Sequence, residues 1–211
     1  MTFRSAGLVA ALLLGLTACF SPLTSSSPPP SYYQLAYAED PVECAQPVAA
    51  AIRVWPLEEV SPYDRDEMVV ARSALEVSFS RQNHWIAAPG RMLSQMLIRD
   101  LSQGRMFARV TTALDINPSP YHLGGHLFKF AWEWVGGAHR AVLDAEIFFW
   151  REEPHGEVLL NRRYHFESPP MTGNAPELFA QAMSDAARRF STRLRSDLCA
   201  TRIDSSSRGD D

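Results

Sequence analysis

Hydrophobic residues recur along the chain with two different periods, and each period predicts one kind of element. Apolar residues at helical spacing fill Pro89–Gln103, and Gly104 behind them suits a C-terminal stop, so a helix is predicted there. A second amphipathic helix is predicted over Ala175–Leu198, because its apolar residues form one stripe. Asn174 is the predicted N-cap, and Glu177 three residues later completes a capping-box pattern.

Alternation of apolar and polar residues predicts the strands. Three long runs come late in the chain: Tyr121–Trp134, His139–Arg151 and Val158–Phe166. Gly136-Gly137 between the first two is a hairpin signal. Shorter extended stretches are Val48–Trp55, Glu67–Arg72, Ala74–Ser80 (with Leu75, Val77 and Phe79 on one face) and Phe107–Thr112. The predicted fold class is therefore α+β, a mostly antiparallel sheet with a long-stranded C-terminal meander and two amphipathic helices packed on one face.

The long strands carry more aromatic side chains than one buried face needs. In Tyr121–Trp134 the even-numbered positions hold most of them, including Trp132 and Trp134. On the next strand, Phe148 and Trp150 lie on the face opposite the buried one. A second apolar face needs cover by another subunit, a partner protein or lipid, unless helices or strand twist cover it within the chain. These four aromatic residues are therefore candidate partner-binding residues.

The first residues have the layout of an export signal. Arg4 precedes an apolar run that is too short to span a bilayer, and small residues stand directly before Cys19. The sequence Leu16-Thr17-Ala18-Cys19 resembles the bacterial lipobox, in which lipid is attached to the cysteine; the alternative is an ordinary signal peptide. The residues after Cys19 are Phe20 and Ser21 rather than Asp, which by the sorting rule of enterobacteria favours the outer membrane.

Composition and cysteine count define the rest of the organisation. The 211 residues are 46% hydrophobic and carry a net charge of −4, which suits one globular domain and argues against nucleic acid as a partner. The predicted segments are a signal peptide over 1–18, a Ser/Pro-rich tether over 19–31, one periplasmic domain over 32–203 and a disordered tail over 204–211. Cys44 and Cys199 are an even pair in an exported domain, so a disulfide is predicted, with two separate thiols as the alternative.

No sequence motif indicates catalysis. Phosphate loops, dinucleotide fingerprints, nucleophile elbows and metal-ligand patterns are missing, so neither enzyme activity nor a cofactor or metal is expected. His122 and His126 are four apart on a predicted strand, which is too far for one metal, and sheet packing is their expected role. Glu152 is expected on the surface of a hairpin turn. The arginines near the end of the second helix, at 188, 189, 193 and 195, are expected to be solvated.

The order of motifs resembles the ABC-type transport auxiliary lipoprotein family, which includes the paraquat-inducible lipoprotein of enterobacteria. A lipobox and tether are followed by Tyr32-Tyr33-Gln34-Leu35, by Val69-Val70-Ala71-Arg72 and by the block from His84 to Leu93, HWIAAPGRML. The likeness continues through Tyr121 to Phe130. One departure is Ala88, near which an acidic residue is expected in the family.

The resemblance implies a non-catalytic partner of an MCE-type ABC system, which moves hydrophobic molecules between the inner and outer membranes. The partners would be an MCE-domain protein with its permease and ATPase, and the lipoprotein itself could form a ring. In that picture Trp85 is either an interface anchor or a core residue behind the first helix. Two other functions stay open: a stand-alone carrier of lipid or small molecules, and a lipoprotein of outer-membrane assembly.

Overall fold

The fold is a sheet with both helices on one of its faces. The computed structural model describes residues 28–152 and 156–201, so the predicted signal peptide, Cys19, most of the tether and the tail from 204 lie outside the described residues. The elements in chain order are β1 Ser31–Tyr33, β2 Val48–Val54, β3 Glu58–Glu59, β4 Glu67–Ala71, β5 Val77–Trp85, α2 Pro89–Gln103, β6 Phe107–Thr112, β7 Tyr121–Val135, β8 Ala138–Arg151, β9 Glu157–Glu167 and α3 Pro176–Ala200. No helix in this region is long and apolar enough to cross a membrane.

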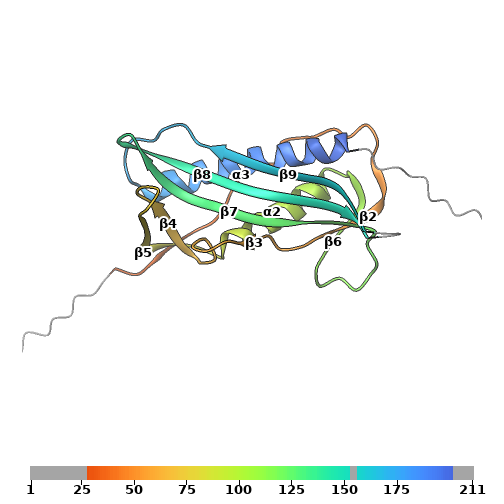
Figure 1. The fold of residues 1–211 in the computed structure, drawn as a ribbon, viewed down its shortest axis with the longest axis horizontal. Coiled ribbons are helices and arrows are strands. Elements are labelled where there is room, and N and C mark those ends of the chain that lie inside the picture. The colour runs from red at the N-terminus through yellow and green to blue at the C-terminus, as the bar shows by residue number, and fades with distance from the viewer. Residues whose placement is uncertain (1–27, 153–155, 202–211) are drawn as a thin grey trace, which may run out of the picture.

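Strand β7 is the central strand of the sheet and pairs with β2, β3, β4 and β8 (Figure 1). Along one edge it pairs with β8 in antiparallel fashion, and β8 pairs in the same way with β9, which confirms the predicted meander. Along its other edge, the short strands β2, β3 and β4 pair with successive segments of β7, all in parallel. The α+β class is confirmed, whereas the parallel pairings were not predicted. Residue alternation defines the faces of a strand but not the direction of its neighbour.

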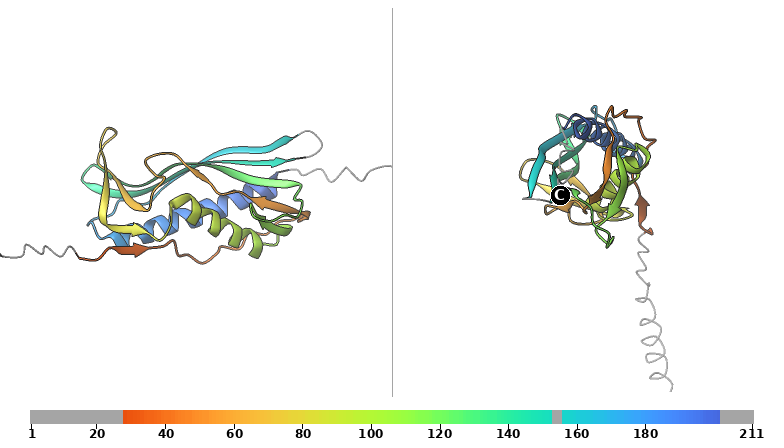
Figure 2. Two further views of the ribbon diagram at one scale, coloured as in Figure 1. Left: turned by 90° about the horizontal axis from the view of Figure 1, so that it is seen from below. Right: turned by 90° about the vertical axis from the view of Figure 1, so that its right-hand side faces the viewer.

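The two helices lie side by side on the same face of the sheet, α3 against β8 and β9 of the meander and α2 mainly against β6 (Figure 2). Helix α2 has the predicted bounds, and it begins with a proline, which is suited to a first turn. Helix α3 begins later than predicted, at Pro176, with Ala175 as its N-cap and no side-chain hydrogen bond at that cap. The expected capping role of Asn174 is therefore wrong, because the proline moves the first helical turn forward by one residue.

A β-bulge divides the aromatic residues of β7 between the two faces of the sheet. Leu127 pairs with Ala145 but Lys129 pairs with Asp144, so Phe128 between them has no partner on β8. One extra residue reverses the alternation of the side chains. The core side chains of β7 are Tyr121, Leu123 and Leu127 before the bulge and Phe130 and Trp132 after it. The prediction that the even positions share one face is therefore wrong.

The turn of the β4–β5 hairpin is longer than the sequence predicted, because the second strand begins three residues later than expected. Strand β5 begins at Val77, and the backbone N–H of Arg72 donates to the carbonyl oxygen of Glu76 across the turn, 2.9 Å away. Leu75 lies at the tip, where its side chain is 99% exposed. The expected common face of Leu75 and the two following apolar residues is therefore wrong, because Leu75 belongs to the turn.

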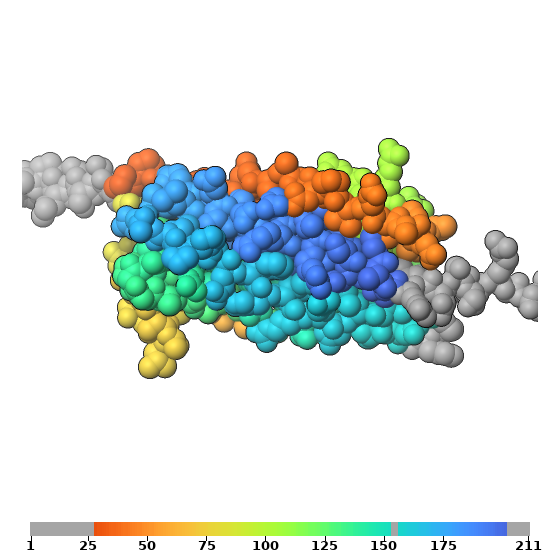
Figure 3. Space-filling view, turned by 90° about the horizontal axis from the view of Figure 1, so that it is seen from above, coloured from red at the N-terminus to blue at the C-terminus, as the bar shows by residue number. Residues whose placement is uncertain are grey.

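An extended segment of residues 34–46, called the strap below, runs along α3 (orange beside blue in Figure 3). Its Leu35 is buried in the core, and its Tyr37 hydroxyl donates to Asp100 of α2 at 2.9 Å. Burial raises the pKa of Tyr37, and the Asp100 carboxylate raises it further, so the phenol keeps its proton and remains a donor. Ser191 of α3 also donates to Asp100, so one buried carboxylate joins the strap to both helices.

The arginines of α3 are not all solvated, contrary to the sequence-based expectation. Arg195 is fully buried and pairs with Glu39 of the strap, while Arg188 pairs with Asp40. Arg193 remains exposed and pairs with Asp197 one turn further along the helix. The strap lies over the side of α3 that would otherwise face water, which explains why Arg195 is buried.

Candidate functional site

The candidate site is an open groove on the face of the sheet opposite the helices, called the outer-face groove below. Its volume is about 600 Å³, and the residues that line it are Trp55, Pro56, Glu58, Gly124, Gly125, His126, Phe148, Trp150 and Val158. They come from the end of β2, from β3, and from the halves of β7, β8 and β9 that lie far from the β7–β8 turn. The wall is mainly apolar, so the groove suits an apolar ligand or side chain.

A buried histidine positions the two tryptophans of the groove. The His122 ring stacks on Trp150, with centroids 5.2 Å apart, and lies 6.1 Å from the ring of Trp55. The indole N–H of Trp55 donates to His122 Nδ1 at 3.1 Å, and an indole nitrogen cannot accept. His122 therefore carries its proton on Nε2, from which it donates to Glu152 Oε2 at 2.8 Å. Both indoles are held in one arrangement by this network.

Glycine 124 makes room for the groove. A Cβ at this position would lie 3.4 Å from Trp55 Cβ and 3.5 Å from the Trp150 ring. Gly125 has a different role, because a Cβ there would collide with the backbone carbonyl oxygen of Glu146 on β8. The first glycine therefore sets the depth of the groove, and the second permits the close approach of β7 and β8.

Charged side chains continue the outer face beyond the groove. Arg163 of β9 donates to Asp144 of β8 at 2.8 Å and lies over the Phe128 ring, and His165 also contacts Asp144. Burial raises the pKa of Asp144, but the hydrogen bonds from Arg163 and His165 lower it by more, so this pKa lies below its usual range. An apolar centre beside a polar border is the usual composition of a protein interface.

The structure separates the five aromatic residues that the sequence proposed for partner binding. Phe148 and Trp150 line the outer-face groove. Trp85 is 1% exposed and packs edge-on against Phe130, and Trp132 stacks on Phe179 in the core. Trp85 and Trp132 therefore both belong to the core, although Trp132, which is 5% exposed, also lines a hollow near the β7–β8 turn. Trp134 is partly exposed near the β7–β8 turn, away from the groove.

Sequence reasoning missed Trp55, His122 and Val158 as parts of the site. Trp55 stood at the end of a predicted strand before Pro56, and His122 was assigned to sheet packing, which is correct but incomplete. Glu152 was assigned to plain surface, and it is exposed, but it also accepts a hydrogen bond from His122 Nε2. The local sequence carries no signal for these contacts, because they join residues that lie far apart in the chain.

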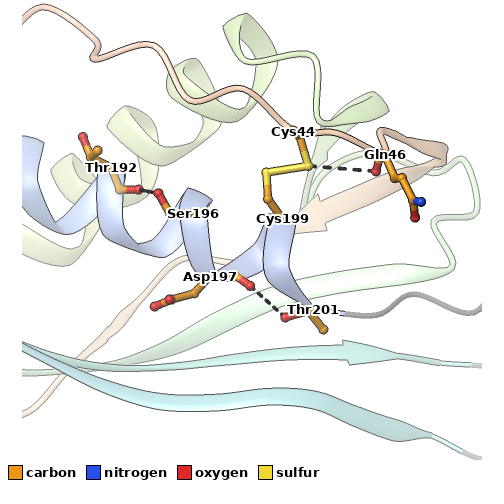
Figure 4. Close-up of a disulfide and its surroundings, with 7 residues drawn as sticks. All are labelled: Cys44, Gln46, Thr192, Ser196, Asp197, Cys199 and Thr201. Atoms are coloured by element: carbon orange, nitrogen blue, oxygen red, sulfur yellow. Dashed lines mark hydrogen bonds between the residues drawn. A yellow bond between two sulfur atoms is a disulfide. The ribbon is translucent and has the colours of Figure 1, made fainter.

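The predicted pairing of Cys44 with Cys199 is present in the structure (Figure 4). The two Cα atoms are 5.4 Å apart, within the usual range for a disulfide. The bridge joins the end of the strap to the last turn of α3 and closes a separation of 155 residues. Its place at the edge of the domain indicates a structural role.

A second hollow of about 550 Å³ lies near the β7–β8 turn, at the other end of the sheet. It is lined by Val70, Arg72, Glu76, Trp132, Trp134, His139 and Asn174. Burial lowers the pKa of His139, and the nearby Arg72 lowers it further, so His139 is neutral at physiological pH. Within residues 28–152 and 156–201, no group of three or more His, Cys, Asp or Glu side chains could hold a metal ion.

Comparison with known proteins identifies the family. The sequence matches the ABC-type transport auxiliary lipoprotein component over residues 33–194, and the chain belongs to that family. The family consists of auxiliary transport components, which are not catalytic, and it places the chain at a membrane of the cell envelope. A search of curated proteins finds no match.

Solved structures share the fold. Protein XCC0632 from Xanthomonas campestris, which carries the family label DUF330, is similar with a TM-score of 0.73 and 17% identity, over 81% of this chain and 95% of that one. An uncharacterized protein gives a TM-score of 0.62 and 15% identity, over 81% of this chain and 99% of that one. Hypothetical protein CT253 from Chlamydia trachomatis gives a TM-score of 0.52 and 5% identity, over 73% of this chain and 98% of that one.

Proposed function

We propose that this chain is a lipid-anchored periplasmic component of an MCE-type ABC system that moves lipids or other hydrophobic molecules between membranes. Cys19 carries the anchor, the anchor lies in the outer membrane, and the domain docks the MCE protein together with its permease and ATPase. The observation that carries this proposal is the outer-face groove, an apolar surface on the side of the sheet opposite α2 and α3, in a chain that belongs to a family of transport auxiliary components.

The groove has the properties of a protein-docking surface. Tryptophans dominate the binding energy of many interfaces when a partner side chain fills the space between them. Here Trp55 and Trp150 are already ordered by His122, so a partner would lose little conformational freedom in arranging them. The neighbouring charges of Asp144 and Arg163 supply a polar border that would favour one orientation of the partner.

A carrier function is the second candidate, and the size of the groove favours it. A volume of about 600 Å³ falls within the usual range for small-molecule pockets. A carrier would bind one lipid per chain in the groove and would need no partner protein. The two functions therefore differ in what occupies the same surface.

Photo-crosslinking from two positions distinguishes these functions. A photoreactive phenylalanine derivative replaces Trp150 in the groove or Gln181, which is exposed on α3. The tagged lipoprotein is irradiated in native membranes, and the crosslinked proteins and lipids are identified by mass spectrometry. The docking function predicts that an MCE protein is captured from position 150 and not from position 181.

The same experiment can contradict the docking function. Capture of a lipid alone from position 150, at about one per chain, would establish the carrier function instead. Trp150→Ala and Trp150→Phe provide a second measurement, because the phenyl ring can still stack on His122. Docking predicts that the alanine variant loses the MCE protein in a pull-down while the phenylalanine variant retains part of it, with both variants folded by circular dichroism.

A further inference from the structure

Two hairpin tips at one end of the domain hold apolar side chains in water. Leu75 at the tip of the β4–β5 hairpin has no internal partner, and Trp134 and Val135 before the β7–β8 turn are each 45% exposed. Both tips lie at the end where β1 begins, on the left in Figure 1. The second hollow joins them, because Arg72 and Glu76 of one hairpin line it together with Trp134 of the other.

These side chains are held outward by ordered turns. At the β4–β5 tip, the N–H of Leu75 donates to Ser73 Oγ at 3.2 Å, inside the turn closed by Arg72 and Glu76. At the other tip, Gly136 and Gly137 both have positive φ values, as in the two-residue turns that suit a twisted hairpin. Turn tips are usually polar. Folding of the chain therefore does not explain the leucine at position 75.

The position of the N-terminal segment relates this end of the domain to a membrane. About twelve residues separate Cys19 from the first residue of β1, Ser31. Fully extended, they span at most about 40 Å. β7, with 15 residues, is about 50 Å long, so the anchored end stays near the bilayer while the opposite end can point away.

We propose that this end of the domain rests on the phospholipid surface, with Leu75, Trp134 and Val135 entering the interface between headgroups and acyl chains. The proposal rests on the lipid anchor of the proposed function but not on its MCE partner. Tryptophan favours this interface, and aliphatic side chains gain by leaving water. The short tether keeps the effective concentration of the membrane high, so a weak contact suffices. Arg72 belongs to the same turn as Leu75; its side chain is 61% exposed and pairs loosely with Glu76 at 3.8 Å through Nε, so its outer N–H groups can meet lipid phosphates.

The contact orients the domain with respect to the membrane. The outer-face groove lies towards the opposite end of β7, as does the loop that carries Leu114 (Figure 1). With the hairpin tips on the bilayer, the groove is presented towards the periplasm. An assembly that reaches the outer membrane from the inner one would approach from that side.

Site-specific labelling tests the proposal. Leu75→Cys and, as the matched control, Leu114→Cys are labelled with an environment-sensitive fluorophore. Both native leucines are more than nine-tenths exposed, at 99% and 93%. Cys44 and Cys199 are joined, and Cys19 carries the lipid, so the new cysteine is the reactive thiol. The lipidated protein is reconstituted into vesicles of phosphatidylethanolamine and phosphatidylglycerol that contain brominated acyl chains.

The expected result is a blue shift and a loss of fluorescence at position 75, with no change at position 114. Adding Trp134→Ser and Val135→Thr to the labelled Leu75→Cys protein is expected to reduce both changes, and a lost fold would be visible by circular dichroism. Equal signals from positions 75 and 114 in protein that floats with the vesicles would overturn the membrane contact while leaving MCE docking intact. Protein that does not float would overturn the anchor as well as the contact.

Discussion

Arg195 of α3 is buried and forms an ion pair with Glu39 of the strap, 156 residues away in the chain. A second donor of the same guanidinium reaches the backbone carbonyl oxygen of Asp40 at 2.7 Å. Together with the Cys44–Cys199 bridge, these contacts tie the strap to the C-terminal half of α3. The strap near the start of the domain is thus held against α3, the last helix, so the two ends of the domain are joined.

Arg195→Met is expected to lower the free energy of unfolding by about 3 kcal/mol, because removal of one partner leaves the other charge partly buried and unpaired. Arg193→Met is the matched control two residues away. The Arg193 side chain is 54% exposed, and Asp197 keeps Arg162 and the Tyr164 hydroxyl as partners without it, so a change within about 0.5 kcal/mol is expected. Urea denaturation measures both variants, and equal effects would contradict the structural role of Arg195.

Loss of the disulfide is expected to destabilise the domain. Cys199→Ser should lower the free energy of unfolding by about 3–5 kcal/mol, because the bridge restricts a long loop in the unfolded chain. Urea denaturation with and without a reductant provides the control. The wild type and the variant should differ only without reductant, and identical midpoints under oxidising conditions would show that the bridge contributes nothing.

Gly124→Ala and Gly125→Ala are expected to differ sharply although the two positions are adjacent. A Cβ at 124 makes ordinary contacts with Trp55 and Trp150, so the alanine variant should keep nearly the stability of the wild type and narrow the groove. A Cβ at 125 would collide with the backbone of β8, which cannot move without breaking its hydrogen bonds to β7. Gly125→Ala is therefore expected to lower the free energy of unfolding by about 3 kcal/mol. Thermal unfolding compares them, and equal stabilities would contradict this assignment.

Asp144 is expected to make stability depend on pH. Its pKa is lowered in the folded state, so its contribution is fully present above the pKa of the unfolded chain and is lost as the pH falls through the folded-state pKa. Asp144→Asn should lower the unfolding free energy by about 0.5 kcal/mol near neutral pH. The difference from the wild type should begin to shrink as the pH falls below about 4, the usual pKa of an aspartate in an unfolded chain, and should vanish once the pH lies below the folded-state pKa. Asp64→Asn, at an exposed position, should keep the pH dependence of the wild type, and a constant difference for Asp144→Asn would refute the effect.

Local sequence predicted the elements well because their causes are local. The apolar stripe and the flanking Pro89 and Gly104 determine α2, and Gly136-Gly137 determines the turn between the two longest strands. The cysteine pair was also predictable, since Cys44 and Cys199 are the two cysteines that remain after the proposed lipidation site Cys19, and two cysteines allow one internal bridge. The family resemblance agreed with these elements over nearly the whole domain.

The candidate site was only half predictable. Phe148 and Trp150 were assigned to the correct face, because β8 alternates without interruption over that stretch. Trp132 was assigned to the wrong one, because the alternation of β7 reverses at Phe128. Trp55 belongs to the groove only because β2 pairs in parallel with β7, a contact between distant parts of the chain.

The sequence by itself determined both described helices and the longer strands, how the last three strands connect and which cysteines can pair, since each depends on residues close together in the chain or on simple counting. The short strands β1 and β3 were not predicted, because they exist only through pairing with distant segments. The tertiary structure alone decided which side of the sheet the aromatic rings of β7 occupy and which arginine of α3 is buried. Strand register and strap position depend on pairing between distant segments, and one extra residue in β7 is enough to exchange the core and the outer face.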